Sequence, residues 1–194
     1  MAVKVLKQME VKPLPLFRVD SDQYNSGDTI LPKGTYQAGI DEARQRIEES
    51  LARTNTLESG IQRKDCVFLF DDLKNALLFF KNKTEKANLY KVIIDSHDFV
   101  YKGDMNYLDF LLEVVHNTRG EDDKLILDAY AKKYWKVGFG CASPCYELLF
   151  KKATVEELVI AASSVEAQHF YLEIKTNLYV HITDTYKALV EKYY

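Results

Sequence analysis

The most informative stretch of the sequence is Cys66-Val67-Phe68-Leu69-Phe70-Asp71-Asp72, because it joins five apolar residues to a pair of acidic ones. A short apolar run of this kind is typical of a buried strand. Asp71 or Asp72 can then accept hydrogen bonds from the first backbone N–H groups of a helix. The residues that follow repeat with helical spacing and form one apolar face, namely Leu73, Ala76, Leu77 and Phe80. The stretch therefore predicts a buried strand that leads directly into a helix.

The segments before this run predict another strand and another helix. Leu16–Val19 is mostly apolar and predicts a strand. Turn signals follow at Asn25–Asp28 and at Pro32–Gly34. A helix is predicted from about Tyr36, because one apolar face recurs with helical spacing at Ile40, Ala43, Ile47 and Leu51.

The segments after the run continue the alternation of strands and helices. Further strands are predicted at Leu89–Asp95, Phe99–Tyr101 and Cys145–Phe150. Asp104 is predicted to cap a helix, and Lys124–Tyr134 predicts another. A Gly-bearing loop is predicted at Gly138–Pro144.

The tail carries two competing patterns. Phe170, Leu172 and Ile174 alternate as in a strand, but helical spacing runs from Ala167 to Leu189. The longer pattern predicts a C-terminal helix. Together the segments predict a single α+β domain over residues 1–194.

Composition excludes several classes of protein. The 194 residues are 47% hydrophobic, which is ordinary for a globular protein. The formal net charge of −3 does not favour general electrostatic binding to nucleic acid. Cys66, Cys141 and Cys145 are odd in number and no signal peptide is recognisable, so we expect a reducing, cytoplasmic setting. Their spacing does not predict a metal site. Apolar runs such as Leu77–Phe80 are too short to cross a membrane.

Several segments resemble the ADP-ribosyltransferase-like superfamily, which includes mono-ADP-ribosylating toxins, DarT-like enzymes, tRNA 2′-phosphotransferases and uncharacterised bacterial and phage-type members. The resembling segments are Leu16–Val19 with Gly27–Ile30, Val67–Asp71 with Leu73–Ala76, Leu89–Val92, Tyr101–Asn106, Tyr134-Trp135 and Cys145–Leu149. The resemblance covers roughly residues 16–163 and rests on their order and spacing. It implies a split mixed β-sheet with flanking helices, and NAD as the substrate. The superfamily often has Ser or Tyr in the second strand, where this chain has Phe68 and Phe70.

The resemblance implies that Glu147 is the catalytic carboxylate. Cleavage of nicotinamide from ribose develops positive charge on the sugar, and a nearby carboxylate stabilises that charge. Glu147 interrupts an apolar strand, where an unpaired carboxylate is costly. The alternative is that strand alternation points Glu147 to solvent.

Four other residues are expected to bind NAD. The guanidinium of Arg18 offers a rigid fork of donors that suits a pyrophosphate or a ribose. Its alternatives are a surface position or a structural ion pair with Asp20 or Asp95. The rings of Phe68, Phe70 and Tyr90 can stack on nicotinamide, although core packing is the simpler explanation for each of them.

The function predicted is that of an NAD-dependent mono-ADP-ribosyltransferase. Its acceptor stays open among a protein side chain, a nucleic-acid base and a small molecule. For a macromolecular acceptor, the net charge favours a protein over a nucleic acid. Two alternatives stay open: an NAD glycohydrolase, and a degenerate member that binds a nucleotide or a protein without chemistry. The sequence contains no G-x-G-x-x-G run and no phosphate-binding loop that ends in Gly-Lys-Ser/Thr.

Overall fold

The strands form two sheets in a computed structural model that describes residues 14–34, 42–117, 122–136 and 144–194. The four-stranded sheet has the order β1 (Leu16–Asp20), β4 (Asn88–Ile93), β7 (Ala153–Ile160) and β2 (Thr29–Ile30). The three-stranded sheet has the order β3 (Val67–Leu69), β6 (Tyr146–Phe150) and β5 (Phe99–Asp104). Every strand pair in the described ranges is antiparallel. The α+β class is therefore confirmed, and the expectation of a mixed sheet is wrong.

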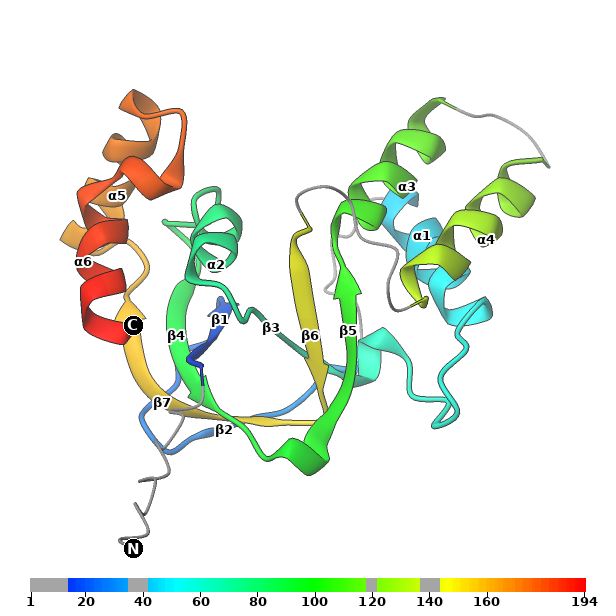
Figure 1. Ribbon diagram of the computed structural model, residues 1–194, viewed down its shortest axis with the longest axis horizontal. Coiled ribbons are helices and arrows are strands. Elements are labelled where there is room, and N and C mark those ends of the chain that lie inside the picture. Colours follow the sequence, from blue (N-terminus) through cyan, green and yellow to red (C-terminus); the bar gives the residue numbers. More distant parts are fainter. Residues whose placement is uncertain (1–13, 35–41, 118–121, 137–143) are drawn as a thin grey trace, which may run out of the picture.

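Within the described residues, one isolated backbone bridge joins β1, at the edge of one sheet, to the residue that follows β3, at the edge of the other. Phe17 and Phe70 exchange backbone hydrogen bonds of 2.9 and 2.8 Å. One residue further along β1, the Nη1 group of Arg18 donates to the backbone oxygen of Phe68 at 3.0 Å. Strands β4 and β7 bend strongly, so that the four-stranded sheet curls like half a barrel (Figure 1). The sheets are thus joined at β1 and β3 and split from there.

Six α-helices lie in the described ranges, in two groups on either side of the split (Figure 1). They are α1 (Glu42–Arg53), α2 (Leu73–Phe80), α3 (Asn106–Asn117), α4 (Asp122–Tyr134), α5 (Val165–Thr176) and α6 (Asp184–Tyr193). Three 3₁₀ turns accompany them, η1 (Arg63–Asp65), η2 (Ser96–Asp98) and η3 (Val180–Ile182). Helix α2 begins as predicted, because Asp72 accepts hydrogen bonds from the backbone of Lys74 and Asn75. None of these helices is long and apolar enough to span a membrane.

Three clusters of buried side chains follow from this layout. One lies between β1, β4 and helices α2, α5 and α6, and the second lies between β5, β6 and helices α1, α3 and α4. The third fills the space between the two sheets and includes Leu69, Tyr90 and Val155. The helical groups therefore bury one face of each sheet, and the sheets bury parts of each other.

The structure differs from the sequence predictions at several elements. The C-terminal helix is present, but it is two helices, because Thr183 ends η3 and caps α6 through a hydrogen bond from Tyr186 N. Strands β2 and β7 were not predicted. Asp104 lies in β5 and accepts hydrogen bonds from the backbone of Asn106 and Cys145, so it supports the start of α3. The predicted start of the first helix at Tyr36 and the Gly138–Pro144 loop, apart from Pro144, lie outside the described residues.

Candidate functional site

A cavity of about 500 Å³ lies where the two sheets separate, and we call it the inter-sheet cavity. Its walls come from β1, β3 and β6, from α1 and α3, and from α2 with the segment that follows it. Figure 1 shows α2 facing α1 and α3 across these strands. Four of the predicted site residues line it: Arg18, Phe68, Phe70 and Glu147. The volume falls within the range of about 300–1,000 Å³ that is usual for sites that bind small molecules.

Glu147 is held in the wall by a dense set of hydrogen bonds. The residue is 2% exposed, so the alternative that it points to solvent is wrong. Arg63 donates to it from Nε at 3.0 Å and from Nη2 at 2.8 and 2.9 Å. The hydroxyl of Tyr134 donates to the same carboxylate at 2.5 Å. A buried carboxylate is stable only when it is paired in this way.

Arg63 also contacts a second carboxylate, that of Glu48 on α1. Burial, which is the largest influence, lowers the pKa of Arg63, but the neighbouring Glu147, Tyr134 and Glu48 together raise it well above its ordinary value. The other oxygen of Glu48, Oε2, is buried and has no hydrogen-bond partner in the described part of the chain. We call the four residues Arg63, Glu48, Glu147 and Tyr134 the buried centre. It contains two carboxylates and one guanidinium.

Tyr134 reaches Glu147 because the residue opposite Glu147 on β5 is a glycine. Gly103 pairs with Glu147 in the sheet register. A Cβ atom at Gly103 would lie 2.4 Å from the ring of Tyr134, so only glycine leaves room for the ring. Burial, and then the charge of Glu147, raises the pKa of the Tyr134 hydroxyl well above its ordinary value, so that it stays a hydrogen-bond donor.

A second group of charges lies at the rim of the cavity, on and near β1. Arg18 donates to Asp20 from Nε at 3.0 Å and from Nη2 at 2.7 Å. Lys33 donates to the other oxygen of Asp20 at 2.8 Å. The structural ion pair with Asp20 that the sequence left open is therefore present. We call Arg18, Asp20 and Lys33 the rim centre.

Arg18 retains donors that could reach a ligand. A guanidinium has five N–H groups. Two of them bond to Asp20 and one bonds to Phe68, all within the described residues. One N–H on Nη1 and one on Nη2 remain, on a side chain that is 15% exposed and lines the cavity.

The rim carries more positive charge than the rim centre alone. Among the described residues that line the cavity, seven are Lys or Arg and four are Asp or Glu. Lys83 lies over the ring of Phe79 at 4.0 Å. Although its side chain reaches solvent, partial desolvation and then the charges of Arg18 and Arg44 lower the pKa of its ammonium group. Positive groups gathered in this way at a cavity favour an anionic ligand.

The predicted aromatic residues divide into two sets. Phe68 and Phe70 line the cavity, and the guanidinium of Arg63 lies 4.8 Å above the ring of Phe68. Tyr90 is 1% exposed and belongs to the cluster between the sheets, where its hydroxyl donates to the backbone oxygen of Asp22 at 3.0 Å. Tyr90 therefore packs in the core and is not among the described residues that line the cavity.

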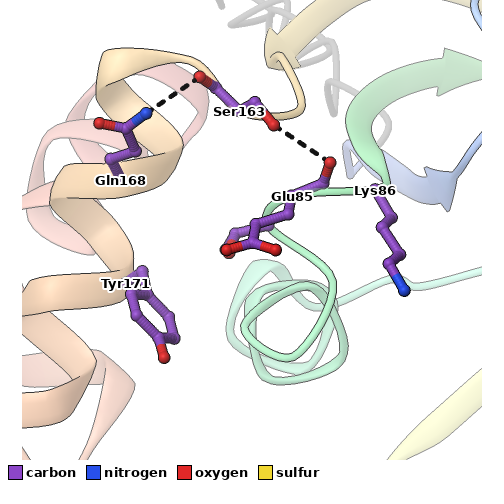
Figure 2. A pocket seen from close by; sticks show the side chains of 6 residues that line it. Glu85, Lys86, Ser163, Gln168 and Tyr171 are labelled. Carbon is purple, nitrogen blue, oxygen red and sulfur yellow. Dashed lines mark hydrogen bonds between the residues drawn. The ribbon is translucent and has the colours of Figure 1, made fainter.

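A second pocket of about 440 Å³ adjoins the cavity and shares Lys86 with it. Figure 2 shows its lining, which comes from the segment after α2 and from the start of α5. The Ser163 hydroxyl donates to the backbone oxygen of Glu85, and Gln168 donates to the backbone oxygen of Ser163. The bond between Ser163 and Glu85 joins the two segments. The inter-sheet cavity is the stronger candidate, because its acidic, basic and aromatic side chains converge on one space.

Sequence reasoning missed the residues that hold Glu147 in place. Arg63 is 84 positions from Glu147, and its polar neighbourhood does not distinguish it from a surface residue. Tyr134 was noticed only through a resemblance. Comparison with family models, with curated proteins and with solved structures finds no match to this chain.

Proposed function

We propose that the inter-sheet cavity binds NAD and that the protein is an NAD-dependent mono-ADP-ribosyltransferase. The observation that carries this proposal is that Arg18 and Glu147, 129 positions apart, line one cavity together with two phenylalanine rings. The resemblance to the ADP-ribosyltransferase-like superfamily, stated from sequence, assigns the same two residues to NAD. The surplus of basic residues around the cavity suits the pyrophosphate of the dinucleotide.

The proposed reaction replaces one bond at the ribose. The bond between C1′ and the nicotinamide nitrogen breaks, and its electron pair leaves with nicotinamide. An electron pair of the acceptor nucleophile then forms the new bond to C1′, and the nucleophile loses its proton. Glu147 contributes negative charge beside the oxocarbenium-like sugar, while the remaining N–H groups of Arg18 hold a phosphate or ribose oxygen. The acceptor in this proposal is a protein side chain.

The test uses NAD labelled in the adenosine part and follows both nicotinamide release and label on macromolecules. We expect nicotinamide release by the wild type and label on protein. We expect Glu147→Gln to lower release by about a hundredfold or more, because glutamine keeps the shape and loses the charge. The matched control is Glu156→Gln, since Glu156 lies on β7 and is not among the described residues that line the cavity. Unchanged release in a folded Glu147→Gln variant would reject Glu147 as catalytic.

A second function, binding without chemistry, is favoured by one observation. The carboxylate of Glu147 already accepts four hydrogen bonds, three from Arg63 and one from Tyr134, which leaves little capacity for a substrate hydroxyl. The same assay separates the candidates. Binding of NAD with no nicotinamide release indicates a binding protein, and release without label on any macromolecule indicates a glycohydrolase.

A further inference from the structure

The buried centre carries a net negative charge of its own. Arg63 bridges Glu48 and Glu147, so one positive group serves two carboxylates and the formal charge is −1. The side chains of Arg63, Glu147 and Glu48 are 7%, 3% and 14% exposed, so water screens this charge weakly. A cavity wall with a fixed negative charge attracts a positive group of a ligand.

Glu48 is the less compensated of the two carboxylates. Glu147 accepts four hydrogen bonds, whereas Glu48 receives donors at only one of its oxygens. Its Oε2 atom is buried without a partner in the part of the chain that the structure describes. A buried polar atom without a partner costs free energy, so such a group persists where function or folding demands it. The surplus charge of the buried centre therefore belongs chiefly to Glu48.

Glu48 also lies next to the positive part of the cavity. Arg44 and Glu48 are one helical turn apart on α1, and both line the cavity. Side chains at this spacing start about 6 Å from each other. A single ribose, of comparable length, separates a phosphate of NAD from its nicotinamide ring. The side chains of Arg44 and Glu48 thus leave α1 at about the separation of the phosphate and the ring.

We propose that Glu48 makes the cavity selective for the oxidised dinucleotide, NAD⁺, over the reduced form, NADH. This inference rests on the proposed NAD site. The nicotinamide ring carries a positive charge in NAD⁺ and none in NADH, while the pyrophosphate and adenosine are the same in both. A negative side chain beside the ring stabilises only the oxidised form. Glu48 is therefore a determinant of specificity, and Arg63, which is itself bonded to Glu147, holds it in place.

The test measures affinity by calorimetric titration with three ligands. The first is a carbocyclic NAD⁺, which keeps the pyridinium charge but cannot be cleaved through an oxocarbenium ion. The second is NADH, and the third is ADP-ribose, which has no nicotinamide. We expect the wild type to bind the oxidised analogue about tenfold more tightly than NADH. Glu48→Gln should reduce this preference to within about twofold and leave the affinity for NADH and ADP-ribose unchanged. The amide oxygen of the variant can still accept a hydrogen bond from Arg63, which favours folding.

Glu49→Gln is the matched control, because it removes one charge from the same helix at an exposed position that is not among the described lining residues. It should keep the wild-type preference. Equal affinity of the wild type for the two redox forms would overturn the proposal, and so would a preference that survives in Glu48→Gln. If Glu48→Gln does not fold, the test uses Asp109→Asn, because Asp109 on α3 also lines the cavity. Loss of the preference there assigns it to Asp109 and rejects Glu48, and a preference that survives there supports Glu48. If none of the three ligands binds to the wild type, the proposed function itself fails.

Discussion

The two charge centres of the inter-sheet cavity use the same kinds of side chain in opposite ways. In the buried centre, Arg63 and Glu147 are 7% and 3% exposed and satisfy each other almost completely. In the rim centre, Arg18 and Lys33 are 15% and 30% exposed around a buried Asp20. A basic residue in a cavity wall is therefore not in itself a ligand contact. What matters is how many of its donors the protein has already used.

This difference assigns a different role to each centre. Arg63 bonds to Glu147, Tyr134 and Glu48, so the centre fixes the geometry of one wall of the cavity. Arg18 joins the two sheets through Phe68 but keeps two N–H groups for a ligand. Loss of the Arg63 cation should therefore reduce the stability of the fold, and loss of the Arg18 guanidinium should chiefly reduce binding.

The largest effect is expected from Arg63→Met. The substitution leaves Glu147 and Glu48 without their cation in a buried site, which should lower the free energy of unfolding by about 3–5 kcal/mol. Urea denaturation measures the loss. Lys187→Met is the control, because it breaks an exposed ion pair with Asp184 and should cost less than about 1 kcal/mol. Similar losses in the two variants would show that the ion pairs of Arg63 stabilise the fold no more than an exposed ion pair does.

Gly103→Ala should have the next largest effect. The added Cβ would lie 2.4 Å from the ring of Tyr134, which is 1% exposed and cannot move freely. Overpacking of this kind usually costs about 1–3 kcal/mol. Thermal unfolding measures it, and the same change in a Tyr134→Leu background should cost clearly less, because the clash is gone. Equal costs in the two backgrounds would contradict the close approach of the two residues.

Arg18→Ala should affect binding more than stability. Loss of one charge-assisted hydrogen bond to NAD should weaken its affinity by roughly tenfold or more. Arg18→Lys should also weaken it, because an ammonium group is a point charge and not a planar fork. Titration of NAD together with a thermal melt separates the two roles. Normal affinity with a lower melting temperature would reduce Arg18 to its structural contacts with Asp20 and Phe68.

Local sequence patterns predicted the elements that depend on interactions between residues close together in the sequence. The run around Phe68 gave β3 and the cap of α2, because apolar spacing and a capping carboxylate act over a few residues. Strand β7 was missed because Glu156 and Glu157 interrupt its apolar residues, and the break between α5 and α6 was missed because apolar spacing continues across it.

The charged residues of the cavity that could be predicted are those that stand out from their own strands. Arg18 and Glu147 are charged residues in apolar runs, and both line the cavity. Arg63 could not be recognised, because its role depends on a partner 84 positions away. The core position of Tyr90 could not be told from sequence, because alternation along a strand does not indicate which face meets the cavity and which meets the other sheet.

The smallest effect, and the one that tests the rim centre most finely, concerns acid stability. Burial raises the pKa of Asp20. The charge of Arg18 and hydrogen bonds from Lys33, Arg18 and the backbone of Asp22 lower it by a larger amount, so the pKa lies below 3.8 in the folded protein. A carboxyl group with a lowered pKa stabilises the fold above its unfolded pKa and loses that contribution as pH falls through the folded value. The wild type should therefore be more stable than Asp20→Asn at neutral pH, and the difference should shrink as the pH falls below 3.8.

Urea unfolding at a series of pH values measures this difference, with Asp184→Asn as a control for the loss of a carboxylate at an exposed position. A difference between the wild type and Asp20→Asn that is independent of pH would mean that Asp20 acts through packing alone. A difference that widens in acid would mean that burial dominates the pKa of Asp20. Arg18 would then be held less firmly than its two bonds to Asp20 indicate, and more of its donors would be open to a ligand.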